Sequence, residues 1–249
     1  MMGHARRGTQ GAVPTLTFLP IRSLSPTAPP MAQAPLRNTQ PRTTDTMPAH
    51  PYSHEALHTR GDVPPRPHLN CYWLVPGVLL AGEYPGTKEE ASSRAKLRAT
   101  LQAGVRHFVD LTEAREGLVH YDTLLQQEAA ALGVAVSHER HAIRDLDVPS
   151  DPDALRDLTT RLRTPREGAT YVHCWGGIGR TGTVIGCLLV DLGFSGQQAL
   201  DLIALKWQVM EKRHRQPQSP QTEAQHEFVR AWERSRPRFD QALPRPARG

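Results

Sequence analysis

The chain has 249 residues and a formal net charge of +5, enough for one ordinary domain with tails. The charge is uneven: residues 1–68 hold 7 basic and 3 acidic side chains, residues 69–205 hold 13 and 17, and residues 206–249 hold 10 and 5. An acidic central region without a basic, aromatic stripe argues against a nucleic-acid-binding domain. Three scattered cysteines exclude a disulfide scaffold and a zinc cluster.

The two ends of the chain differ in composition from the region between them. Residues 1–67 contain 12 of the 22 prolines and few aromatic residues, so we predict a disordered, proline-rich segment. Residues 236–249 have a similar character and are predicted to form a flexible basic tail. The single compact domain is therefore expected at 68–235. No secretory signal is recognisable, and the apolar stretch 184–192 is far shorter than the roughly 20 residues of a membrane helix. We expect a cytoplasmic monomer without membrane contact.

Strand and helix signals alternate along the compact region. Strands are expected at 72–75, 78–81, 105–111, 134–138 and 171–173. Helices are expected from a Thr87–Glu90 capping box to 103, at 121–132, at 152–163 behind an Asp151 cap, at 181–192, at 195–213 and at 219–234. This order predicts an α/β fold, with a central twisted, parallel-rich sheet of about 4–5 strands and helices on both faces.

One glycine pattern invites a nucleotide-binding interpretation. Residues 177–182 read Gly-Ile-Gly-Arg-Thr-Gly, which matches G-x-G-x-x-G. A dinucleotide fingerprint follows the first strand and has an acidic residue at the end of the next strand. Here the pattern follows the last expected strand, and the acidic residue at that distance, Asp201, lies within an expected helix. The context therefore argues against a dinucleotide site.

A second interpretation begins at Cys174, which stands where a strand ends and a helix begins. Five residues separate it from Arg180: Trp175, Gly176, Gly177, Ile178 and Gly179. Such a small-residue loop lets backbone N–H groups converge on an anion at a helix N-terminus, and the arginine adds a planar fork for phosphate oxygens. This setting favours a reactive thiolate. His173 can brace the loop, and Thr181 can donate a hydrogen bond to the sulfur.

These residues resemble a known signature. His173-Cys174-x5-Arg180-Thr181 is similar to the HCxxGxxR[ST] motif of the cysteine-dependent protein tyrosine phosphatase superfamily. The short filling of the loop is most similar to atypical dual-specificity phosphatases, including the cyclin-dependent-kinase-associated type. The resemblance covers about 69–233. There is no WPD tripeptide, no phosphotyrosine-recognition loop and no lysine within the cysteine-to-arginine loop.

A proton donor is expected on the segment 141–151, which follows a strand and carries three aspartates. Asp151 is interpreted as a helix cap, which leaves Asp145 and Asp147 open as the general acid. The atypical phosphatases carry an I-x-D-x-x-x-P pattern, which Ile143, Asp145 and Pro149 match. The resemblance therefore favours Asp145.

A third element, Gln221-Thr222-x-x-Gln225, resembles the QTxxQ segment with which some members of the superfamily position water in the second step. The same residues also read as an ordinary helix start. We keep Gln221 and Gln225 as candidate catalytic residues on the resemblance alone.

Together these features predict a phosphomonoester hydrolase with a phosphocysteine intermediate, without metal or cofactor. The resemblance implies a phosphorylated protein as substrate, with a protein-tyrosine or dual-specificity activity. Three alternatives remain: hydrolysis of a small phosphoester such as an inositol phosphate, rhodanese-type sulfur transfer, and a non-catalytic phosphate-binding module. Cys71 could in principle form a disulfide with Cys174, although no pattern in the sequence brings the two together.

Overall fold

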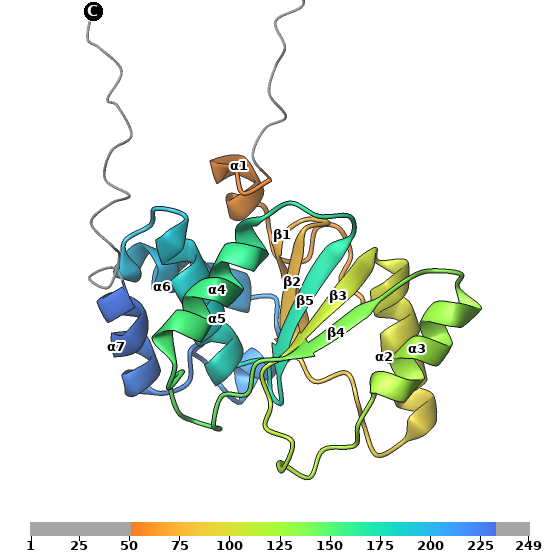
Figure 1. Cartoon of the computed structure of the whole chain (residues 1–249). Coiled ribbons are helices and arrows are strands. Elements are labelled where there is room, and N and C mark those ends of the chain that lie inside the picture. Colours follow the sequence, from red (N-terminus) through yellow and green to blue (C-terminus); the bar gives the residue numbers. More distant parts are fainter. Residues whose placement is uncertain (1–50, 233–249) are drawn as a thin grey trace, which may run out of the picture. The chain divides into compact units, whose positions relative to one another are not determined.

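The computed structural model describes residues 51–232, and these residues form an α/β fold around a single five-stranded sheet (Figure 1). The strand order is β1-β2-β5-β3-β4, in which β1 pairs antiparallel with β2 and every other pair is parallel. The strands are β1 (Cys71–Val75), β2 (Leu79–Glu83), β3 (Val105–Asp110), β4 (Ser137–Arg140) and β5 (Ala169–Cys174). The predicted fold class is confirmed.

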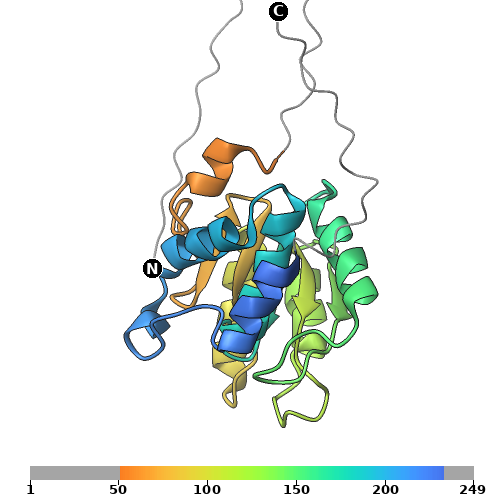
Figure 2. The ribbon, with the colours of Figure 1, turned by 90° about the vertical axis from the view of Figure 1, so that its left-hand side faces the viewer.

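Helices cover both faces of the sheet, and each face has its own apolar core. On one face pack α2 (Glu90–Gln102) and α3 (Asp122–Ala131). The other face carries α4 (Pro152–Arg163), α5 (Gly179–Asp191), α6 (Gly196–Trp207) and α7 (Glu223–Trp232), with the 3-10 helix η1 (Glu211–His214) between the last two. Figure 2 views the molecule from the side of α6 and α7. Residues 179–190 of α5 are all buried, as the almost wholly apolar sequence of this helix predicts.

Residues 51–67, which the composition places in a disordered segment, are ordered in the structure. They include α1 (His54–His58), whose Leu57 is 1% exposed. The backbone of β1 is bonded to this segment, because the Trp73 N–H donates to the Gly61 carbonyl at 2.8 Å. The ammonium of Lys206 on α6 is buried and donates to the Thr59 carbonyl. The proline-rich composition did not predict these contacts, because their partners lie in the folded domain and not in the segment itself. Residues 1–50 and 233–249, including the predicted tail, lie outside the described residues.

Several boundaries differ from prediction: α5 begins at 179 rather than 181, β4 begins at 137 rather than 134, and three further helix boundaries differ as follows. The helix α2 begins at Glu90, and Thr87 is not its cap: the Thr87 N–H donates instead to the Ser93 hydroxyl at 2.8 Å. The helix α6 has the capping box at Ser195 but ends at Trp207 rather than 213. Beyond it the chain follows tertiary hydrogen bonds, including one from the Glu211 N–H to the carbonyl of residue 69. The last helix begins at 223 rather than 219.

The sheet brings the carboxyl ends of its parallel strands to one edge. Glu83 at the end of β2 is the register partner of Cys174, and Asp110 at the end of β3 is the partner of His173. In open α/β sheets this edge is where ligands bind. None of the helices within residues 51–232 combines the length and the apolar character that crossing a bilayer requires.

Candidate functional site

The segment from Cys174 to Arg180, named here the cysteine loop, connects the central strand β5 to the buried helix α5. Every residue of β5 is buried, and Cys174 is 3% exposed. Ile178 occupies the N-cap of α5 and supplies no side-chain cap to its first N–H groups. In residues 51–232, no hydrogen-bond acceptor meets the backbone N–H groups of residues 176–179. The loop thus offers its N–H groups at a helix N-terminus, the arrangement that binds anions.

Neighbouring segments hold this loop in place through its carbonyl groups. The Tyr84 N–H donates to the Trp175 carbonyl at 3.0 Å, and Lys212 Nζ donates to the Gly176 carbonyl at 3.2 Å. Lys212 in turn forms an ion pair with Glu83 at 2.7 Å. Because these carbonyls accept hydrogen bonds from surrounding groups, the neighbouring segments fix the conformation of the loop.

Gly177 shows why the loop needs small residues. Its φ is +72°, a conformation that costs an L-residue about 1–2 kcal/mol. A Cβ at this position would lie 2.3 Å from the carbonyl carbon of Gly82. The loop therefore rests directly on the backbone of β2, and only glycine fits.

Arg180 is 1% exposed and is held by two carboxylates. Its two terminal nitrogens form a fork with Glu116, Nη2 at 3.0 Å from Oε2 and Nη1 bonded to Oε1. Nη2 also lies 2.9 Å from Asp145 Oδ1, and Nη1 donates to the Ile143 carbonyl at 3.0 Å. The remaining nitrogen, Nε, is buried without a hydrogen-bond partner in the described residues. The guanidinium is thus locked in orientation and keeps one donor free.

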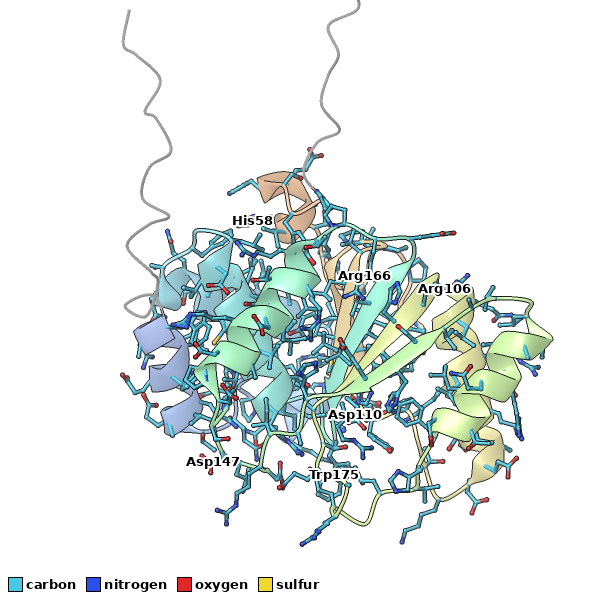
Figure 3. The ribbon with its side chains drawn as sticks, in the orientation of Figure 1. His58, Arg106, Asp110, Asp147, Arg166 and Trp175 are labelled. Carbon is cyan, nitrogen blue, oxygen red and sulfur yellow. The ribbon has the colours of Figure 1, made fainter. Side chains whose placement is uncertain are left out.

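The two candidate acids, Asp145 and Asp147, have different contacts in the structure. They lie on residues 143–149, named here the aspartate loop. Asp145 contacts Arg180, and its side chain is 47% exposed. The Asp147 carboxylate accepts from the Val148 N–H at 2.8 Å, and its backbone carbonyl accepts from Gln225. Leu146, between them, has a φ of 62°. Asp147 and Trp175 lie beyond the same end of the sheet, opposite to the end where Arg106 and Arg166 lie (Figure 3). The geometry therefore brings Asp145, and not Asp147, to Arg180.

His173, the residue of β5 that precedes Cys174, is completely buried. Its Nε2 shares a hydrogen bond of 2.6 Å with the Tyr121 hydroxyl, and its Nδ1 lies 3.9 Å from Asp110 Oδ1. Burial lowers the pKa of His173 to about 4, although the Asp110 carboxylate opposes this shift. The ring is therefore neutral near pH 7. For Asp110, burial would raise the pKa, but the nearby His138 ring, 3.8 Å away, and the two hydrogen bonds that the carboxylate accepts from Thr112 outweigh burial and hold the carboxyl pKa below its usual value.

The other predicted residues divide into buried and exposed ones. Thr181 is fully buried, and its hydroxyl has no partner among the described residues. Trp175, next to the cysteine, is 58% exposed. Gln225 is fully buried with its amide bonded, whereas Gln221 is exposed.

The disulfide between Cys71 and Cys174 considered from the sequence is absent from the structure. Cys71 and Cys174 are both free thiols, and they belong to the apolar cores on opposite faces of the sheet. The Cys71 thiol donates to the His68 carbonyl at 3.1 Å, and burial raises its pKa to about 12. The structure therefore does not pair Cys71 with Cys174.

A pocket of about 240 Å³ lies beside the aspartate loop rather than over the cysteine. It is bounded by Ile143 and Pro149 of that loop and by Leu155 and Leu158 of α4, and is mostly apolar. Within residues 51–232, no cluster of three or more His, Cys, Asp or Glu side chains could hold a metal ion. The polar chemistry of the site is thus concentrated around Cys174 and Arg180.

Sequence reasoning missed the residues that support the loop from a distance. Glu116 and Lys212 come from two separate segments, and no local motif marks them. One signal existed for Glu116: it follows β3, whose carboxyl end meets that of β5 at the same edge.

Comparison with known proteins identifies the family. Residues 68–229 match the family model "PTP-SAK: Swiss Army Knife protein, DSP-PTPase phosphatase domain". None of the curated proteins matches the chain. Among solved structures, Tk-PTP in its active form is 24% identical, with 64% of this chain and 93% of that chain covered and a TM-score of 0.44.

Two further structures are similar at the same level. The kinase associated phosphatase with its catalytic-site cysteine substituted by serine is 23% identical, covering 63% of this chain and 85% of that chain with a TM-score of 0.45. TpbA of P. aeruginosa in complex with phosphotyrosine is 17% identical, covering 68% of this chain and 93% of that chain with a TM-score of 0.41. The family model spans well over half of the chain and includes the whole of the cysteine loop. The chain belongs to the PTP-SAK family of dual-specificity-type phosphatase domains, within the cysteine-dependent protein tyrosine phosphatase superfamily.

Proposed function

We propose that this protein hydrolyses phosphomonoesters through a phosphocysteine on Cys174. The observation that carries the proposal is that one short loop between β5 and α5 holds the buried Cys174, backbone N–H groups without an acceptor among the described residues, and the buried Arg180. Such preorganised donors stabilise the charge that develops on the equatorial oxygens of a transferring phosphoryl group. The free Nε of Arg180 adds a charged donor to the same set.

In the first step, the Cys174 thiolate attacks phosphorus and the bond from phosphorus to the ester oxygen breaks. Asp145 gives its proton to the departing oxygen, because an alkoxide or phenoxide leaves poorly without one. The contact of Asp145 with Arg180 supports this assignment over Asp147, since it places the carboxyl beside the cysteine loop.

In the second step, Asp145 takes a proton from water while the water oxygen attacks phosphorus. The phosphorus–sulfur bond then breaks, inorganic phosphate leaves and the thiolate returns. The buried Thr181 hydroxyl, which has no other partner among the described residues, can donate to that thiolate. His173, neutral and bonded to Tyr121, supports the loop without exchanging a proton.

For the substrate we propose a phosphorylated protein, with phosphotyrosine first. Trp175 is exposed beside the nucleophile and offers an aromatic face on which an aryl ring can stack. A small phosphoester remains the second candidate, because the same chemistry serves both. A reducing, cytoplasmic setting belongs to the proposal, since the mechanism requires a free thiol at Cys174.

The test is hydrolysis of an aryl phosphate in the presence of a chelator. We expect Cys174→Ser to abolish turnover and Asp145→Ala to reduce it by about 100-fold, the range of general acid catalysis. Asp147→Ala is the matched control and should keep turnover within about threefold of wild type. Undiminished turnover in Cys174→Ser would overturn the mechanism, and loss confined to Asp147→Ala would reassign the acid. Phosphopeptides and inositol phosphates, compared by kcat/KM, then decide the substrate class.

A further inference from the structure

The side-chain amide of Gln225 joins three segments of the site. Gln225 is fully buried. Its Oε1 accepts from the N–H groups of Gln221 at 3.0 Å and Thr222 at 3.1 Å, just before α7. Its Nε2 donates to the carbonyl of Asp147 at 3.0 Å. The amide therefore ties the start of α7 to the aspartate loop.

The same amide rests against the cysteine loop. A Cβ at Gly179 would lie 2.8 Å from both Nε2 and Oε1 of Gln225, so the glycine leaves room for the amide. Gln225 thus lies between the loop that carries the cysteine and the loop that carries the candidate acid.

The aspartate loop has few other attachments. Its turn closes on itself through a bond of 3.1 Å from the Asp147 N–H to the Arg144 carbonyl. Apart from such internal bonds, residues 144–150 are bonded to the rest of the described chain at two points. One is the ion pair of Asp145 with Arg180, and the other is the bond from Gln225 to the Asp147 carbonyl. Ile143, at the start of the aspartate loop, is bonded by its backbone to Leu111 and Arg180. Beyond it, the bond from Gln225 is the only one that holds residues 144–150 by their backbone to the rest of the described chain.

We propose that Gln225 is a positioning residue that holds Asp145 over the cysteine loop by fixing the backbone of Asp147. This inference rests on the proposed function of the site. It differs from the water-positioning role that the resemblance of the QTxxQ segment implies. A carbonyl oxygen has two lone pairs, and both of those on Oε1 already accept backbone N–H groups, so that oxygen has no lone pair left to orient a water.

The two roles affect different steps and can be separated by the leaving group. A good leaving group such as dinitrophenol departs without a proton, whereas phenol needs the general acid. We expect Gln225→Ala to lower kcat/KM about 10- to 100-fold for phenyl phosphate and less than about threefold for 2,4-dinitrophenyl phosphate, the pattern expected of Asp145→Ala. Gln225→Glu keeps an oxygen acceptor but loses the donor to Asp147, so it should show the same selectivity. Gln218→Ala, exposed on the neighbouring connection, is the matched control.

Two results would overturn the role of Gln225. If it orients water instead, both variants will keep kcat/KM and lower kcat equally for the two substrates, with a burst of released phenol as phosphocysteine accumulates. If it only supports the fold, kcat/KM will fall alike for both substrates. An inactive wild type, or an active Cys174→Ser variant, would overturn the proposed function itself and this inference with it. If the wild type is active and its activity depends on Cys174, the proposed function stands, and a contrary result for the Gln225 variants then overturns this inference alone.

Discussion

The cysteine loop and the aspartate loop are joined by the ion pair of Arg180 with Asp145 but are built differently. The cysteine loop is enclosed: it rests on the backbone of β2, its carbonyls are bonded to Tyr84 and Lys212, and its arginine is buried. The aspartate loop is exposed from residue 144 to 147, and beyond Ile143 it is bonded to the rest of the described chain through Arg180 and Gln225 alone. Packing thus fixes Cys174 and the N–H groups beside it, whereas Asp145, the proposed acid, lies on a segment that the side chains of Arg180 and Gln225 contact.

The largest test of this difference is Gly177→Ala. An alanine at a φ of +72° costs about 1–2 kcal/mol, and its Cβ would press on the backbone of Gly82, which adds about 1–3 kcal/mol of overpacking. We expect the free energy of unfolding to fall by about 2–5 kcal/mol and kcat to drop about 100-fold or more, because the loop N–H groups move. Denaturant unfolding and aryl phosphate turnover measure the two effects.

Gly133→Ala is the matched control, because its φ is +67° and a Cβ there would meet no atom within 4 Å. Its free energy of unfolding should fall by only the backbone cost of about 1–2 kcal/mol, and its kcat should be unchanged. Equal losses of stability and activity in the two variants would show that the cysteine loop is not held by its contact with β2.

The second test uses pH and the buried His173. Burial lowers its pKa to about 4 from the ordinary 6.5, so the unfolded chain binds more protons than the folded protein between these values. The free energy of unfolding should therefore fall as pH drops from 6.5 to 4, by up to about 3 kcal/mol from this residue. His68, with a pKa lowered to about 4 mainly by burial, adds to the same slope.

Denaturant unfolding at a series of pH values measures this slope, and the range above about pH 7.5 is the internal control, because there the imidazole is almost unprotonated in both states and His173 contributes almost no slope. NMR of the imidazole nitrogens should show His173 still neutral at pH 5. A protonated ring at that pH would contradict the buried, neutral His173 on which the loop rests.

The cysteine loop was predictable from sequence because its chemistry is local. Strand, cysteine, small residues, arginine and apolar helix follow one another without a gap, and each has a physical reason that a reader of the sequence can state. The same holds for the alternating elements that gave the α/β fold. Boundaries failed where a distant segment decided them, as at the end of α6, where Glu211 bonds to residue 69.

The third test concerns Glu116, which holds Arg180 and which no local sequence pattern predicted. Its fork with Arg180 fixes the plane of the guanidinium, so Glu116→Gln should remove the charge but keep the size and fold. We expect kcat/KM for an aryl phosphate to fall about 10- to 100-fold, or about 1.4–2.7 kcal/mol, through misplacement of the arginine. Glu113→Gln, exposed on the same segment, should leave kcat/KM unchanged. Equal effects in the two variants would mean that general charge, and not the fork, supports catalysis.

The smallest effect on stability is expected in the aspartate loop itself. Leu146 is 53% exposed with a φ of 62°, so Leu146→Gly relieves about 1–2 kcal/mol of strain but adds about 0.5–1 kcal/mol of chain entropy to the unfolded state. The two nearly cancel, and unfolding should change by less than about 1 kcal/mol in either direction. Leu132→Gly, at an ordinary φ of −93°, has no strain to relieve and should lose about 0.5–1 kcal/mol. A large loss of stability in Leu146→Gly would show that the aspartate loop is packed as firmly as the cysteine loop, and the contrast between the two would fail.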